Sequence, residues 1–195
     1  MLDKVFFKKI REDLLSYAEK RREVIKACGD AQHQAKRAIF ALQRDDTTEA
    51  AKNLSSAEKT LVELYKKHRK DNRVFDEGSF KAALEEFTEA VLFKQCLAGE
   101  KIGPIKGISI DPEIVISGLA DVPGELLRYA IKSATERKFD LVKHCYTLAE
   151  DIIGEMVTMD LTGYNRQKFD QAKQSLHKLQ HIVYEVSLRE RGGVL

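Results

Sequence analysis

The feature of this sequence that most constrains its fold is the scarcity of helix breakers. Only 3 of the 195 residues are proline and 11 are glycine, so long helices can run without interruption. Apolar side chains recur every three or four residues along most of the chain, and no stretch of useful length has strand-like alternation. The sequence therefore predicts an all-α protein of six or seven long helices, forming a single domain over residues 1–195.

Interruptions of the apolar pattern predict where each helix begins and ends. Asp71, Asn72 and Arg73 are interpreted as a break, and the longest loop is Gly99 to Pro112, with three glycines and two prolines. The predicted helices cover residues 2–44, 47–70, 76–98, 112–134, 138–159 and 165–191. The helix over 112–134 has the clearest start, because an aspartate cap is followed by proline at its first position. In the second helix, the side chains expected to face inward are Leu54, Ala57, Leu61, Leu64 and Tyr65.

Composition limits the location of the protein. No run approaches the roughly 18 apolar residues that span a bilayer, and charged residues interrupt the first apolar segment, unlike the core of a signal peptide. Cys28, Cys96 and Cys145 are far apart and odd in number, which favours reduced thiols over a disulfide framework. We therefore expect a cytoplasmic protein that does not bind membranes.

Charge is distributed unevenly along a chain whose net charge is only +2. Residues 1–75 carry 18 Lys and Arg against 12 Asp and Glu, whereas residues 76–195 carry 15 against 19. A basic portion beside an acidic one suits phosphate binding on one surface and cation binding on another. Charge counts alone favour a simpler interpretation, in which these residues form a salt-bridged helical surface.

The helix over residues 76–98 contains a pair of glutamates on an otherwise apolar line. Its ordinary core face is formed by Phe80, Leu84, Phe87 and Val91. A second face carries Ala82, Glu86, Glu89, Phe93 and Cys96 at spacings of three and four. Side chains three residues apart are neighbours on a helix, so both carboxylates can reach one point.

The helix over residues 112–134 carries a second acidic pair. Asp121 and Glu125 lie four residues apart, on a different face from the predicted core positions. Pro123, between them, has no N–H to donate to the carbonyl of Leu119 and should kink the helix. A bent helix beside two carboxylates is more typical of a site than of a plain surface.

Four carboxylates brought together would repel one another and could not all remain ionised without a counter-charge. A divalent cation removes this difficulty, and ligands that are all oxygen atoms favour Mg²⁺ or Mn²⁺ over zinc. Such a metal lowers the pKa of bound water and neutralises phosphate. Acidic pairs at these spacings are also common on solvated helices, and periodicity does not show that the two helices face each other.

Four segments of the chain resemble the translin family, and among its members they are more similar to translin-associated factor X than to translin. They are AKRAIFALQRD (Ala35–Asp45), EEFTEAVLF (Glu85–Phe93), SGLADVPGELLRYAIKS (Ser117–Ser133) and KQSLHKLQHIVYEVSLRERG (Lys173–Gly192). The resemblance covers nearly the whole chain in register. Pro123 stands where the family usually has threonine or a similar residue, so a different backbone geometry is expected there. The basic N-terminal extension of factor X is missing, so its eukaryotic nuclear roles are not transferred, and we expect a prokaryotic or archaeal member.

This resemblance implies a function and an assembly. In factor X the two acidic pairs form a metal-dependent ribonuclease site, which corresponds here to Glu86, Glu89, Asp121 and Glu125. It implies an endoribonuclease that binds Mg²⁺ or Mn²⁺ and cleaves single-stranded RNA or a small duplex inside a homo-oligomeric chamber, which we expect to be an octamer. The alternative is a non-catalytic oligomer that binds RNA or single-stranded DNA.

Basic residues in two regions are candidates for RNA contact. One group is the run at the end of the second predicted helix, where cations also favour the helix dipole; the other lies in the matching segments. The predicted RNA-binding residues are Lys36, Arg37, Lys66, Lys67, Arg69, Lys70 and Arg128. Arg128, one turn beyond Glu125, could instead orient that carboxylate. Basic runs are also common on solvated surfaces.

Overall fold

The computed structural model of the chain describes residues 1–68 and 71–192. In this part of the chain all regular structure is helical, as predicted, and no strand is present. The helices are α1 (Lys4–Gln43), α2 (Thr47–His68), α3 (Asn72–Phe75), α4 (Gly78–Leu97), α5 (Pro112–Thr135), α6 (Phe139–Val157) and α7 (Gly163–Gly192). The predicted boundaries of the six longer helices are therefore correct to within about three residues, except that the predicted end of the second helix at residue 70 lies outside the described residues.

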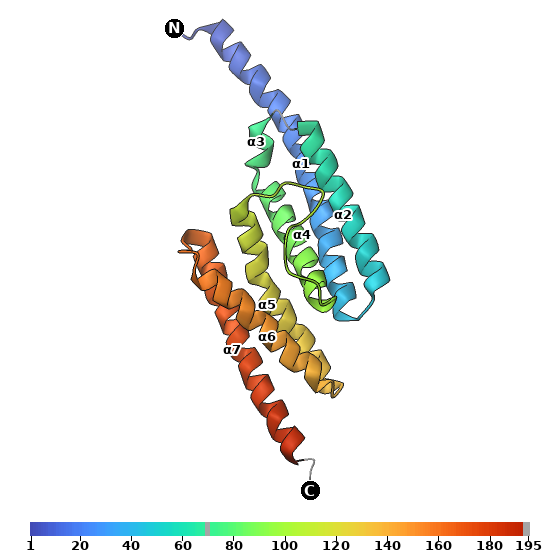
Figure 1. Cartoon of the computed structure of the whole chain (residues 1–195). Coiled ribbons are helices and arrows are strands. Elements are labelled where there is room, and N and C mark those ends of the chain that lie inside the picture. The colour runs from blue at the N-terminus through green and yellow to red at the C-terminus, as the bar shows by residue number, and fades with distance from the viewer. Residues whose placement is uncertain (69–70, 193–195) are drawn as a thin grey trace.

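The long helices form two groups of three (Figure 1). α1, α2 and α4 pack together, α5 packs against α6 and α7, and the contact between α4 and α5 joins the two groups. Buried apolar side chains from both groups form the core, among them Leu61, Phe93, Leu126 and Leu179. The pairing of α4 with α5 positions the site, because each of these two helices carries one of the predicted acidic pairs.

α4 and α5 approach each other closely at Gly118. A Cβ atom at this position would lie 2.8 Å from the backbone oxygen of Glu85 and 2.8 Å from Cβ of Thr88. No side chain fits in that space, so glycine is required for this crossing. The crossing lies one turn before Asp121 on α5 and beside Glu86 and Glu89 on α4, which brings the two acidic pairs together.

The start of α5 is as the sequence predicts. Asp111 caps the helix by accepting a hydrogen bond from the backbone N–H of Glu113 at 2.8 Å, and Pro112 occupies the first turn. Pro123 lies buried inside the helix, so α5 continues through the proline at which a kink was predicted. At its other end, the hydroxyl of Tyr129 donates to Oδ1 of Asp45 at 2.6 Å, which ties α5 to the turn between α1 and α2.

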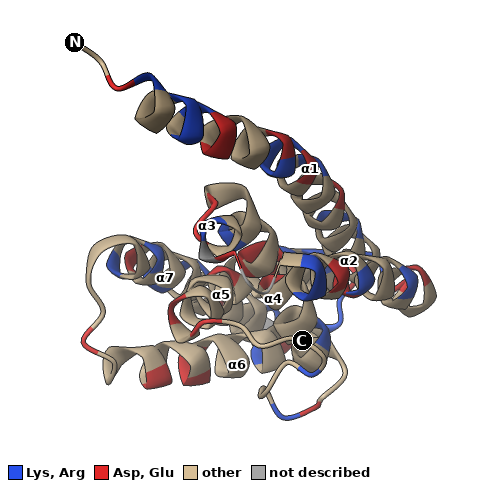
Figure 2. Ribbon diagram, turned by 90° about the horizontal axis from the view of Figure 1, so that it is seen from above, with Lys and Arg blue, Asp and Glu red and all other residues tan. Residues whose placement is uncertain are grey.

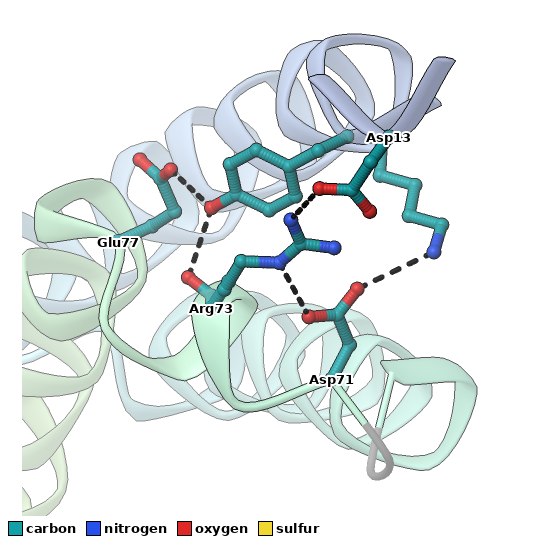
Figure 3. Close-up of polar contacts among 6 residues, drawn as sticks. Asp13, Asp71, Arg73 and Glu77 are labelled. Atoms are coloured by element: carbon teal, nitrogen blue, oxygen red, sulfur yellow. Dashed lines mark hydrogen bonds and ion pairs between the residues drawn. The ribbon is translucent and has the colours of Figure 1, made fainter. Parts of the chain in front are cut away.

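The predicted break at residues 71–73 is wrong in part, because the short helix α3 begins there. Polar contacts with α1 hold it in place (Figure 3). Nη1 of Arg73 donates to Asp13 at 3.0 Å, its guanidinium covers the ring of Tyr17, and the Tyr17 hydroxyl donates to Glu77 at 2.6 Å. These partners lie about 60 residues away in sequence, so local apolar periodicity does not predict the helix.

Four of the five residues predicted to face inward on α2 are buried, but Tyr65 is 40% exposed. Its ring lies 5.2 Å from that of Phe75. Tyr65 is therefore at the edge of the core, with one side against α3 and the other in solvent. The prediction was wrong because a position next to Leu64 on the helix faces the boundary of the apolar stripe.

The N-terminal part of α1 extends beyond the rest of the fold (Figures 1 and 2). We call residues 1–15 the N-terminal arm. Its large apolar side chains are all exposed: Met1, Leu2, Val5, Phe6, Phe7, Ile10, Leu14 and Leu15. Basic and acidic residues are interspersed with them along the helix (Figure 2). Among the described helices, none combines the length and the apolar character needed to cross a membrane.

Candidate functional site

The four predicted carboxylates lie together where α4 and α5 adjoin, and we call them the acidic cluster: Glu86, Glu89, Asp121 and Glu125. Glu89 is 8% exposed, and its neighbours are half-buried. The charges of Asp121, Glu86 and Glu125 all act on Glu89. The fold therefore brings both acidic pairs close to one another, as expected for two neighbouring helices.

Glu89 is a buried carboxyl group without a polar partner. Among the described residues, none donates a hydrogen bond to it or forms an ion pair with it. Burial, followed by the negative charges of the other three acids, raises the pKa of Glu89 to about 9. At neutral pH this group is therefore protonated unless a cation enters the cluster.

The other three members of the acidic cluster each contact a cationic side chain. Nζ of Lys36 lies 3.6 Å from Glu86, and Arg128 lies 3.0 Å from Glu125. Asp121 forms an ion pair with Lys168 of α7. Burial raises the pKa of both Glu86 and Asp121, and these lysines oppose that rise.

Two further residues belong to the site that the sequence did not predict. Gln43, at the end of α1, donates to Oε2 of Glu125 at 2.8 Å. Lys168 contacts Glu85 at 2.6 Å as well as Asp121; burial lowers its pKa, but these two carboxylates raise it above its ordinary value. No sequence signal points to Gln43 or Lys168, because each comes from a helix whose place beside the acids is decided only by packing.

The donor set of the acidic cluster fits a hard divalent cation. Its atoms are carboxylate oxygens, which Mg²⁺ and Mn²⁺ prefer, and the buried Glu89 lacks the counter-charge that such an ion would supply. In the part of the chain that the structure describes, no three acidic, histidine or cysteine side chains already surround one point. Glu86, Asp121 and Glu125 each contact a cation of the chain itself instead. Metal binding at this site therefore requires the outer carboxylates to turn towards the ion.

A cleft with a volume of about 870 Å³ opens beside the acidic cluster. It lies between the first turns of α4, α5 and α7 and the connection from α6, and Glu85, Glu86, Glu113 and Tyr164 are among its lining residues. The hydroxyl of Tyr164 donates to Glu85 at 2.9 Å. Glu86 is the member of the cluster that lines this cleft, and so the acids can be reached from solvent along it.

Comparison with known proteins identifies the family. The model of the Translin family matches residues 19–190, which include both acidic pairs and most of every long helix. This chain belongs to the Translin family.

Solved structures share the fold of this translin-family chain. A crystal structure of AfC3PO has a TM-score of 0.83 at 22% sequence identity, covering 94% of this chain and 97% of that chain. A structure of AfC3PO in complex with duplex RNA has a TM-score of 0.80 at 21% identity, covering 94% and 97%. A crystal structure of apo-NeC3PO has a TM-score of 0.84 at 18% identity, covering 95% and 98%. No curated protein sequence matches the chain.

The predicted RNA-binding residues of the translin-family chain fall in two places. Lys36 and Arg128 lie at the acidic cluster, where each contacts an acid, and Arg37 is exposed on α1 next to Lys36. Lys66 and Lys67 are exposed in the last turn of α2, where Lys67 pairs with Glu23. Arg69 and Lys70 lie outside the described residues. Lys36 and Arg128 thus lie beside the acids, and Lys66 and Lys67 lie apart from them at the end of α2.

Proposed function

We propose that this translin-family chain is a divalent-metal-dependent endoribonuclease of the translin-associated factor X type. The observation that carries the proposal is Glu89, a buried carboxyl group without a partner and with three further carboxylates around it. Burying such a group costs free energy unless its charge is neutralised, and a bound divalent cation would neutralise it. The presence of both acidic pairs favours a function of the factor X type over one of the translin type.

RNA is the proposed substrate, either single-stranded or as a small duplex, with single-stranded DNA as a further ligand. The relative AfC3PO has been solved in complex with duplex RNA. In this chain, Lys36 places positive charge next to the acids, and Arg37 is exposed one position further along α1. Phosphate attraction of this kind supplies most non-specific affinity for nucleic acids, and so it supports binding of the strand beside the acidic cluster.

In the proposed reaction, Glu86, Glu89, Asp121 and Glu125 would hold Mg²⁺ or Mn²⁺, with one of the four acting as the base instead of as a ligand. When bound, the ion makes water a stronger nucleophile and neutralises phosphate charge. The oxygen of a water molecule forms a bond to phosphorus, and the bond between phosphorus and the leaving ribose oxygen breaks. Glu86 is the proposed acceptor of the proton lost by the water, because it lines the cleft, and the leaving oxygen takes up a proton from solvent.

Lys36 and Arg128 have a supporting role in this proposal. Each contacts one acid of the cluster, at 3.6 Å from Glu86 and 3.0 Å from Glu125. Guanidinium and ammonium groups bind phosphate oxygens well. Both side chains can therefore leave the carboxylate that they contact and bind a phosphate group of the RNA instead. The cleft then holds the strand while the acids hold the metal.

The chain is proposed to act as a homo-oligomer, and we expect an octamer that encloses the acidic cluster. The exposed apolar side chains of the N-terminal arm support association, because patches of this kind mark protein contacts. Ile131 of α5 is exposed as well, whereas Ile116, Ile182 and Val183 pack against the core. These three residues therefore contribute to the core of the single chain. A cytoplasmic location and a prokaryotic or archaeal origin remain parts of the proposal.

A cleavage assay on labelled single-stranded and duplex RNA, with Mn²⁺ or with EDTA, tests the proposal. Glu89→Gln and Asp121→Asn should each reduce Mn²⁺-dependent cleavage by about 100-fold or more while RNA affinity stays within about threefold. Glu113→Gln is the matched control, because Glu113 lines the same cleft without belonging to the acidic cluster. Unchanged cleavage in both cluster variants, with EDTA also having no effect, would contradict the proposal.

A second candidate function is a non-catalytic oligomer that binds RNA or single-stranded DNA. One observation favours it: Glu86, Asp121 and Glu125 are already paired with cations of the chain itself. In that case the acids would be structural, and the assay would detect RNA binding without any product that depends on Mn²⁺.

A further inference from the structure

Lys168 lies among the acids of the site, although its helix, α7, contributes none of the four proposed ligands. Its side chain is only 14% exposed. The ammonium group lies 2.6 Å from Oε1 of Glu85 and forms an ion pair with Oδ2 of Asp121. Lys168 therefore pairs with one proposed metal ligand, Asp121 of its own helix group, and with Glu85 of α4 in the other group.

A chain of polar contacts fixes the position of this ammonium group. The hydroxyl of Tyr164 donates to Oε1 of Glu85 at 2.9 Å, and the same oxygen accepts from Lys168. Tyr164 and Lys168 are four residues apart on α7, so they lie on one face of that helix. Glu85 belongs to α4 and Asp121 to α5, so the chain of contacts links three helices. The ammonium group is thus built into the packing of the site and is not a mobile surface charge.

We infer that Lys168 is an internal counter-cation of the acidic cluster, which a divalent metal displaces from Asp121 when it binds. The inference rests on the proposed function, because Asp121 is one of the proposed ligands. An ammonium group and a metal ion cannot occupy the same position against one carboxylate oxygen, so they compete for Asp121. Lys168 stabilises the protein without metal and weakens the affinity for metal. Glu85 remains the partner of Lys168 once Asp121 turns to the ion, and so the lysine keeps a counter-charge in both states.

Calorimetric titration of the metal-free protein with Mn²⁺ tests this competition. Lys168→Met removes the competing charge at similar length and should tighten Mn²⁺ binding by about tenfold. Lys168→Arg retains the charge and should bind Mn²⁺ within about threefold of the original protein. Lys173→Met is the matched control: Lys173 lies on the same helix and also pairs with an aspartate, Asp170, at 2.7 Å, but on the exposed surface. Its Mn²⁺ affinity should not change.

Thermal unfolding in EDTA supplies a second readout that does not depend on activity. Lys168→Met should lower Tm by about 5 °C or more, and Lys173→Met by about 2 °C or less, because exposed pairs stabilise little. Saturating Mn²⁺ should recover most of the loss in Lys168→Met. If that variant does not fold, Lys168→Gln retains hydrogen-bond donors and should show the same increase in Mn²⁺ affinity.

The outcomes separate this inference from the proposed function. Mn²⁺ binding that is equal or weaker in Lys168→Met and Lys168→Gln would overturn the role of Lys168 as a competitor, while Mn²⁺-dependent cleavage by the original protein would still support the nuclease. No Mn²⁺ binding by either the original protein or the two variants would overturn both. Tighter binding in both variants, with Lys173→Met unchanged, is the result that the structure leads us to expect.

Discussion

The side-chain amide of Gln43, at the end of α1, donates one hydrogen bond to the carboxylate of Glu125 at 2.8 Å and another to its backbone carbonyl at 2.9 Å. These bonds connect the two helix groups at the acidic cluster. Gln43→Leu should lower the free energy of unfolding by about 1–2 kcal/mol and weaken Mn²⁺ binding by about tenfold, because outer partners orient metal ligands. Urea unfolding and calorimetry measure the two effects. Gln180→Leu, on the exposed face of α7, is the control; equal effects of the two variants would show that Gln43 does not position Glu125.

Gly118→Ala should separate α4 from α5. The added Cβ would meet backbone and side-chain atoms of α4 at 2.8 Å, so we expect a loss of about 1–3 kcal/mol in the free energy of unfolding and weaker Mn²⁺ binding. Gly154→Ala is the matched control: Gly154 lies within α6 with nothing within 4 Å of the added Cβ, and alanine there should stabilise the protein by about 0.5–1 kcal/mol. A neutral or stabilising Gly118→Ala would show that the crossing is looser than described.

The stability of the metal-free protein should fall as pH rises, because of Glu89. The pKa of its carboxyl group is about 9 in the folded protein against an ordinary value of 4.5. Between these values the folded protein binds a proton that the unfolded chain has lost, and so the free energy of unfolding decreases with pH. Glu89→Gln should remove this dependence and gain roughly 2 kcal/mol or more relative to the original protein between pH 5 and pH 9. Urea unfolding in EDTA at several pH values measures it. The slope should persist in Glu113→Gln; a Glu89→Gln variant with the same slope as the original would mean that Glu89 is ionised in the fold.

Lys36 and Arg37 should contribute to RNA affinity through phosphate contacts. Lys36→Gln and Arg37→Gln should each weaken binding similarly for all RNA sequences and lower the steepness of the logarithmic salt dependence by about 1. Fluorescence anisotropy with labelled RNA at several salt concentrations provides the measurement. Lys143→Gln is the control, because Lys143 pairs with Glu190 at 2.9 Å in the other helix group. Salt dependence that does not change in either variant would assign both residues to the solvated surface.

The sequence by itself determined the helices and part of the site. The regular spacing of apolar residues and the rarity of proline set the long helices, because helix formation depends on neighbours three and four positions away. The same local rule put Glu86 beside Glu89 and Asp121 beside Glu125. The short helix α3 was missed, because its contacts with Asp13 and Tyr17 are made across about 60 residues.

Only the tertiary structure decided which helix faces meet. Gly118 permits the close crossing of α4 and α5 that brings the two acidic pairs together. The spacing of residues within one helix does not show which other helix packs against a given face. The same applies to Gln43 and Lys168, which reach the acids from α1 and α7. Burial of Glu89 and the cations beside the other acids also follow from packing, since the loss of water around a charge depends on every helix that surrounds it.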